Sequence, residues 1–152
     1  MRLEIGSGEY PSDGYEHMDI RSGMPHQEYV GDICNIPFPD NSAEEVKCVM
    51  ILEHLPYNKV PIALAELRRI LIIYGVVKVY VPNLEQLCRF VLDKTQPIMT
   101  LVSWFYGGQD YIENFHTAGF TVDLIVNLLM NAGFEIMTLY GTNGIYIEAM
   151  KC

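Results

Sequence analysis

The stretch that decides the fold is Leu3–Asp19, with the sequence LEIGSGEYPSDGYEHMD. Leu3 and Ile5 alternate with polar residues, which is typical of a short buried strand, and this pattern stops at Gly6 and Gly8. A glycine turn after a strand exposes successive backbone N–H groups, which can hold a carboxylate or a phosphate. The stretch therefore predicts a ligand-binding turn at the end of the first strand.

Three classes of ligand compete for such a turn. A phosphate loop requires Lys-Ser or Lys-Thr after the glycines, and the pair Lys94-Thr95 follows no glycine turn. A dinucleotide fingerprint requires a third glycine where Pro11 stands and an acidic residue about 20 positions further on, whereas Asp19 comes earlier. A carboxylate that ends the very next strand suits a ribose diol without a pyrophosphate, because it accepts both hydroxyl hydrogens. S-adenosylmethionine is such a ligand.

Four blocks of sequence carry a family resemblance: LEIGSG (3–8), HMDI (17–20), GDICNIPFPDNSAEEVKCVMILEHL (31–55) and ELRRILIIYGVVKVYVPNLE (66–85). In this order they resemble the motifs of the class I S-adenosylmethionine-dependent methyltransferases, within the group that has a compact, truncated first crossover. The resemblance resumes weakly over 106–120. Only 11 residues separate Ile5 from His17, so at most one helical turn fits where the wider family has a full helix.

The resemblance implies an α/β fold, a Rossmann-like three-layer sandwich. Its mostly parallel seven-stranded sheet would have the order 3-2-1-4-5-7-6, with an antiparallel hairpin strand at the carboxyl end. Apolar spacing predicts an amphipathic helix from Val60 to Leu71, and 76–82 is a β-branched strand pattern. Val46–Ile51 is typical of a central strand covered on both faces. At 152 residues, we expect residues 1–152 to form a single domain of this kind.

The residues that we expect to bind the cofactor lie at the ends of strands. Gly6, Asp19, Asp32 and Glu53 all fall at such ends, which meet at one edge of an open sheet. In the family pattern, an acidic residue at the position of Asp32 accepts from the adenine amino group, and the apolar residue after it packs on the ring. The full set that the resemblance implies is Glu4, Gly6, Ser7, Gly8, Asp19, Ile20, Asp32, Ile33 and Glu53.

Methyl transfer from a sulfonium needs mainly alignment and exclusion of water. For a hydroxyl acceptor a base helps, and His54 and His116 are the candidate catalytic residues. The alternatives are structural: His54 caps a turn beneath the cofactor, and His116 anchors a loop. The glycine-bounded segment Gly107–Gly119 is expected to be a mobile lid, with nearby aromatic residues lining a substrate pocket or simply packing.

Composition limits the partners. A formal charge of −9 opposes binding to nucleic acid, and we expect a small-molecule methyl acceptor. No long apolar run appears and Met1 leads almost directly into a strand, so we expect a cytoplasmic protein without a membrane partner. The four cysteines are widely spaced and indicate reduced thiols and no metal site. The apolar run Leu71–Tyr74 indicates a homodimer.

Three functional hypotheses remain open at this stage. The first is an active S-adenosylmethionine-dependent methyltransferase acting on a small molecule. The second is a catalytically degenerate S-adenosylmethionine-binding protein or scaffold of the same fold. The third is a structural partner subunit that binds no cofactor, which would leave Asp19 without a ligand.

Overall fold

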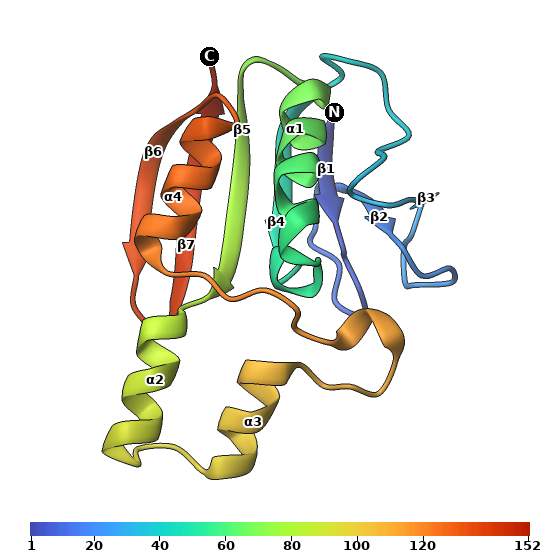
Figure 1. The fold of residues 1–152 in the computed structure, drawn as a ribbon. Helices are drawn as coiled ribbons and strands as arrows, with labels where there is room; N and C mark the ends of the chain where they lie inside the picture. Colours follow the sequence, from blue (N-terminus) through green and yellow to red (C-terminus); the bar gives the residue numbers. More distant parts are fainter.

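The computed structural model describes all residues from Met1 to Cys152 and contains one seven-stranded sheet (Figure 1). The strands follow the order β3-β2-β1-β4-β5-β7-β6, parallel except for β7, which is antiparallel to both of its neighbours. Their bounds are β1 (Arg2–Ile5), β2 (Glu16–Asp19), β3 (Tyr29–Val30), β4 (Ala43–Val49), β5 (Leu71–Pro82), β6 (Phe134–Gly141) and β7 (Gly144–Lys151). The expected strand order and terminal hairpin are confirmed.

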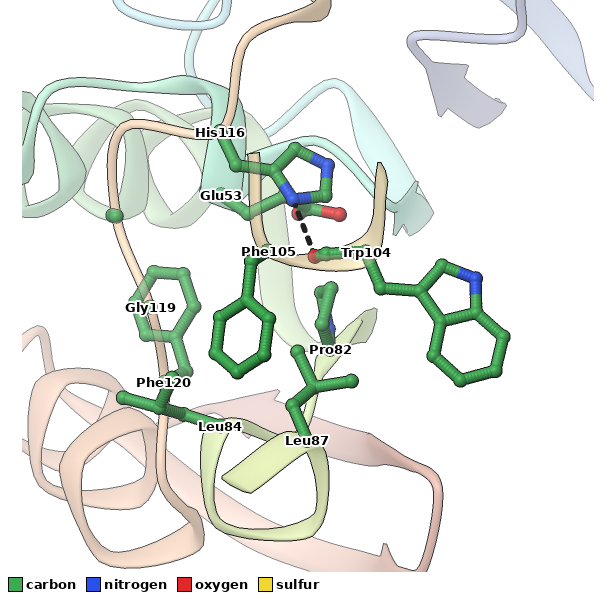
Figure 2. A pocket seen from close by; sticks show the side chains of 10 residues that line it. Glu53, Pro82, Leu84, Leu87, Trp104, Phe105, His116, Gly119 and Phe120 are labelled. Carbon is green, nitrogen blue, oxygen red and sulfur yellow. Dashed lines mark hydrogen bonds between the residues drawn. The ribbon is translucent and has the colours of Figure 1, made fainter. Parts of the chain in front are cut away.

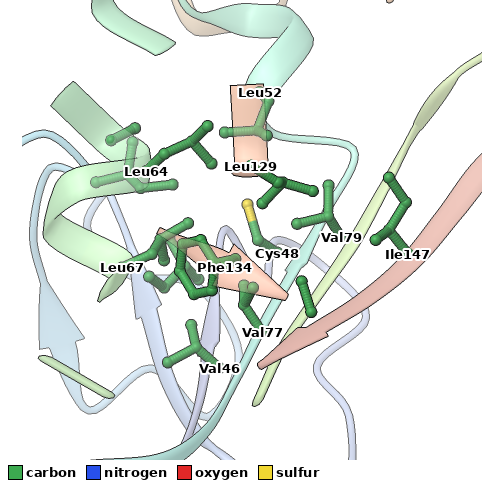
Figure 3. Close-up of a cluster of buried hydrophobic side chains, with 14 of the residues drawn as sticks. Val46, Cys48, Leu52, Leu64, Leu67, Val77, Val79, Leu129, Phe134 and Ile147 are labelled. Atoms are coloured by element: carbon green, nitrogen blue, oxygen red, sulfur yellow. The ribbon is translucent and has the colours of Figure 1, made fainter. Parts of the chain in front are cut away.

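Two helices cover one face of this sheet. They are α1 (Val60–Ile70) and α4 (Val122–Asn131), and Figure 1 shows both on the same side. Their apolar stripes meet the inward-facing residues of β4 and β5, because Leu64, Leu67 and Leu129 share one buried cluster with Val46 and Val77 (Figure 3). Thr121 is the N-cap of α4, since its hydroxyl accepts from the backbone N–H of Leu124 at 3.2 Å.

The opposite face of the sheet carries charged residues and a loop in place of helices. The expectation that the central strand is covered by apolar layers on both faces is wrong: β4 alternates, and Glu45 and Lys47 point away from the core. Tyr15, in the loop 6–15, donates a hydrogen bond to Glu45, and Ser12 donates to Glu4. The crossover is too short for a helix, so this loop stands where a third layer of a Rossmann-like sandwich would lie.

Strand β5 begins earlier than the β-branched pattern predicts. Leu71 pairs with Ala43, but the next paired residue, Val76, lies opposite Glu45, so 72–75 form an irregular insertion in the strand. Tyr74 adopts a positive φ of 65° there. The apolar side chains of Ile73 and Tyr74 consequently project outward, 51% and 73% exposed.

The remaining helices extend beyond the carboxyl end of β5. They are α2 (Leu84–Asp93) and α3 (Ile98–Tyr106), which Figure 1 places together at one end of the molecule. Short 3₁₀ turns occur at η1 (Leu52–His54), η2 (Tyr57–Lys59) and η3 (Ile112–Asn114). No helix in the protein combines the length and apolar character required to cross a membrane. The end of the sheet that carries α2 and α3 is also the end at which the glycine turn lies.

Candidate active site

The glycine turn closes directly after β1. The Gly6 N–H donates to the carbonyl of Met18 at 2.7 Å, and Gly6 has a φ of +70°, in the left-handed region that favours glycine. A Cβ on Gly6 would lie 1.9 Å from Cδ1 of Ile51, so the turn also packs tightly against the segment after β4. The hydroxyl of Ser7 is buried and has no hydrogen-bond partner within the chain. The turn therefore presents an unsatisfied polar group, which a ligand could satisfy.

Asp19 ends β2 and fixes this turn. Its carboxylate is buried, with the residue 4% exposed, and accepts from the Gly8 N–H at 3.0 Å and the Arg21 N–H at 2.9 Å. A carboxylate has about four lone-pair sites; Oδ1 also accepts from Arg21 Nε at 3.4 Å, whereas Oδ2 has one partner and can accept a further hydrogen bond from a diol. The structure thus brings Asp19 and the glycine turn together, as the sequence predicted.

Two apolar residues of the expected cofactor-binding set, Ile20 and Ile33, differ in exposure. Ile20 is 51% exposed beyond the end of β2, whereas Ile33 is 5% exposed and belongs to the hydrophobic core. Asp32 is exposed, and its carboxylate accepts from the Cys34 N–H at 2.8 Å within a tight turn. Ile20 therefore offers the free apolar surface that the sequence assigned to Ile33.

Glu4 lies on the polar face of the sheet and anchors the loop. Its carboxylate accepts from the Ser12 N–H at 2.7 Å and pairs with Lys47 Nζ at 2.9 Å. Burial alone would raise the pKa of Glu4, but the hydrogen bonds from Ser12 and Lys47 outweigh it, and the pKa is lowered. His17, which sequence reasoning set aside, lies 3.3 Å from the same carboxylate. This contact can be predicted only when the register of β1 and β2 is known, because that register pairs Glu4 with His17.

Glu53, His54 and His116 form a cluster just beyond β4. The two imidazole rings have centroids 4.8 Å apart and nearly perpendicular planes, at 79°. Glu53 is 1% exposed, and neither carboxylate oxygen has a hydrogen-bond partner. Burial raises the pKa of Glu53 to about 8. Sequence reasoning named all three residues, but it gave no sign that this carboxyl group is isolated.

The segment Gly107–Gly119 holds His116 in this cluster. The N–H groups of Thr117 and Ala118 donate to the Glu53 carbonyl at 2.7 and 3.0 Å, and the Thr117 hydroxyl donates to the His54 carbonyl at 3.0 Å. The far part of the segment reaches the β2 side, where the Tyr111 ring lies 4.5 Å from the Arg21 guanidinium carbon. The segment consequently spans from the histidines to the neighbourhood of Asp19, and its mobility stays a prediction.

A small cavity lies beside the cluster. Figure 2 shows Phe105, Leu84 and Leu87 converging near Glu53 and His116. Its volume is about 20 Å³, which is room for about one water molecule, so a larger ligand requires α2 and α3 to move apart. Phe105 is one of the aromatic residues near Gly107–Gly119 that were expected to line a pocket or to pack, whereas the sequence analysis did not single out Leu84 and Leu87.

Comparison with known proteins indicates the class of protein to which this chain is similar. A family model described as a methyltransferase domain matches residues 13–79. No curated protein sequence matches the chain. Among solved structures, an S-adenosylmethionine-dependent methyltransferase from Methanosarcina mazei is 18% identical, with a TM-score of 0.71 over 99% of this chain and 91% of its own.

Two further structures share the fold. A methyltransferase from Thermotoga maritima, described as a possible histamine N-methyltransferase, is 18% identical, with a TM-score of 0.72 over 99% of this chain and 82% of its own. The Burkholderia thailandensis 1,6-didemethyltoxoflavin-N1-methyltransferase, bound to its substrate and S-adenosylhomocysteine, is 12% identical, with a TM-score of 0.67 over 99% of this chain and 70% of its own.

These findings confirm the predicted class. The chain has the fold of S-adenosylmethionine-dependent methyltransferases, and its residues 13–79 match a methyltransferase domain. S-adenosylmethionine is the cofactor of this class.

Proposed function

We propose that the protein transfers a methyl group from S-adenosylmethionine to a small-molecule acceptor. The observation that carries this proposal is the cluster of the buried Glu53 with the half-buried His54 and His116, which lies next to an apolar cavity at the same end of the sheet as the glycine turn. Such a site combines apolar walls with a few convergent polar groups, as small-molecule sites do. The formal charge of −9 supports an acceptor other than a nucleic acid.

The residues at the strand ends fit the cofactor. The unsatisfied Ser7 hydroxyl would hold the methionine end, while Gly6 and Gly8, whose N–H groups donate to Met18 and Asp19, shape the turn around it. Asp19 would accept from the ribose hydroxyls, and Asp32 would accept from the adenine amino group. Ile20 would pack on the adenine ring, since its side chain is free of the core. When bound, S-adenosylmethionine supplies a methyl group that its sulfonium already activates.

The chain's own residues would align the acceptor and receive its proton. His54 and His116 have carbonyl partners on Nδ1, at 3.2 Å from Phe115 and 3.0 Å from Trp104, which fix both ring orientations. Burial, followed by the neighbouring His116, lowers the pKa of His54, and burial lowers the pKa of His116. The neutral imidazole, which is the form that accepts a proton, is therefore favoured at neutral pH.

Two of the structurally similar proteins support the small-molecule class by analogy. The Burkholderia enzyme acts on 1,6-didemethyltoxoflavin, and the Thermotoga protein is described as a possible histamine N-methyltransferase. A cytoplasmic location is proposed because all four cysteines are free thiols, which are typical of reducing compartments.

A second candidate function is a cofactor-binding scaffold without turnover. The loop 6–15 in place of a crossover helix favours it, because fewer oriented N–H groups face the methionine carboxylate. Binding without turnover on any acceptor would support this alternative.

Turnover is the test of the proposal. S-adenosylhomocysteine formation would be measured with panels of small hydroxyl and amine compounds. We expect an acceptor whose methylation falls by about 10²–10⁴ in His54→Ala or His116→Ala, the usual contribution of acid–base catalysis, with cofactor affinity nearly unchanged. His26→Asn, at an exposed histidine outside the cluster, is the control and should keep the wild-type rate. Wild-type rates in both cluster variants would contradict the assigned roles.

A further inference from the structure

We propose that Glu53, His54 and His116 bind a divalent transition-metal ion at the carboxyl end of β4. One ligand atom from each side chain, a carboxylate oxygen and two ring nitrogens, lies within 4.8 Å of the others. Ligands of a tetrahedral zinc-sized ion lie about 2.0–2.2 Å from it and hence about 3.3–3.6 Å from one another. Closing the widest separation in the cluster by about 1.5 Å would let the three side chains share an ion.

The isolated carboxylate of Glu53 is the first observation behind this site. Both oxygens are buried without a hydrogen-bond partner, in a residue that is 1% exposed. A buried carboxylate in such surroundings is costly unless it is neutral, paired or bound to a metal. The metal thus supplies the partner that this side chain lacks.

The tautomers of the two histidines are the second observation. Nδ1 of His54 lies 3.2 Å from the carbonyl oxygen of Phe115, and Nδ1 of His116 lies 3.0 Å from that of Trp104 (Figure 2). A carbonyl can only accept, so each Nδ1 carries the proton and each Nε2 retains its lone pair. Metal-binding histidines typically donate their second ring nitrogen to a carbonyl or carboxylate in this way. The chain therefore holds both rings in the form that binds metal.

The ligand set selects the class of ion. Two imidazoles and one carboxylate suit zinc, iron or cobalt, whereas magnesium and calcium prefer oxygen ligands alone. Three protein ligands leave at least one position open, and an ion there would favour proton loss from an acceptor hydroxyl. That last step rests on the proposed function; metal binding itself does not. In this arrangement His54 and His116 act as ligands, and the ion assists deprotonation in place of a free imidazole.

Metal titration of the full-length protein tests the site. After treatment with a chelator and its removal, Co²⁺ and Zn²⁺ would be titrated at pH 7.5 by calorimetry, with the visible spectrum of Co²⁺ as a second readout. We expect one ion per chain, and affinity at least about tenfold weaker in Glu53→Gln and His116→Asn. His26→Asn is the matched control, because His26 is exposed and outside the cluster, and it should bind like the wild type.

The results of this titration distinguish a failure of the metal site from a failure of the proposed function. Absence of Co²⁺ and Zn²⁺ binding, or equal affinity in the wild type and both cluster variants, would overturn the site. S-adenosylmethionine binding measured on the same samples reports on the cofactor site independently. Circular dichroism checks folding, and if Glu53→Gln unfolds, His116→Asn decides, because His116 is only half-buried.

Discussion

At the scale of single residues, Gly6 is the position where backbone conformation and packing both disfavour a side chain most clearly. Its φ of +70° is unfavourable for a side chain, and a Cβ would collide with Cδ1 of Ile51 at 1.9 Å. We predict that Gly6→Ala destabilises the protein by more than about 1–2 kcal/mol, because the collision with Ile51 adds to the cost of a left-handed residue with a Cβ. Urea unfolding measures this change. Gly23→Ala is the control for φ alone, since nothing lies within 4 Å of its Cβ position, and equal losses in the two variants would contradict a packing role for Ile51.

Single residues also show which features could be predicted from the sequence and which could not. The glycine turn and Asp19 were predictable because short-range pattern and chain order place them together. The burial of Ile33 and the isolation of Glu53 were not, because both depend on how β4 and the segment after α3 pack in three dimensions. The contact between His17 and Glu4 likewise depends on strand register, which the residue pattern leaves undetermined.

At the scale of elements, the polar face of the sheet is held by an ionic network centred on Glu45. Arg2 Nη2 and Lys78 Nζ each lie 2.8 Å from its carboxylate, and Tyr15 donates to it from the loop. Burial alone would raise the pKa of Glu45, but the hydrogen bonds from Lys78, Tyr15 and Arg2 lower it from 4.5 to about 2. This network takes over part of the role that a helix layer has in other sheets.

Acid titration tests this network. Because the folded-state pKa of Glu45 is depressed, its stabilising contribution is present above pH 4.5 and is lost as the pH falls towards 2. We predict a decline in the free energy of unfolding over this window that is shallower in Glu45→Gln. Glu44→Gln, at the exposed neighbour on the same strand, should keep the wild-type slope. An unchanged slope in Glu45→Gln would show that the network contributes nothing.

The elements themselves were largely predictable where periodicity is strong. The spacing in Val60–Ile70 and the β-branched run in β5 gave the right element types, and the terminal hairpin followed from its turn. The start of β5 was missed because 72–75 form an insertion within the strand, and apolar residues there resemble the end of α1. The uncovered face of β4 was missed because Val46–Ile51 was taken as a nearly continuous apolar run. The alternation of charged residues along β4 was therefore overlooked.

At the scale of the whole molecule, the insertion in β5 supports the proposed homodimer. Ile73 and Tyr74 are 51% and 73% exposed next to the half-exposed Ile72, and apolar groups that gather on a monomer surface often mark an interface. We predict a species of twice 17.3 kDa by light scattering at tens of micromolar. Ile73→Lys with Tyr74→Lys should shift it to the monomer. Met137→Lys, at an exposed residue on β6, is the control, and a wild-type protein that is monomeric at this concentration would end the proposal.

The most direct test of the central claim is calorimetric titration of S-adenosylmethionine into the wild type and Asp19→Ala. We predict saturable binding to one site per chain, weakened by about 1.5–3 kcal/mol in Asp19→Ala, because charge-assisted hydrogen bonds to the ribose are lost. Asp32→Ala should weaken it less, since water can replace the contact of an exposed carboxylate. No heat and no thermal shift with the wild type at millimolar ligand, or equal affinity in Asp19→Ala, would contradict the account.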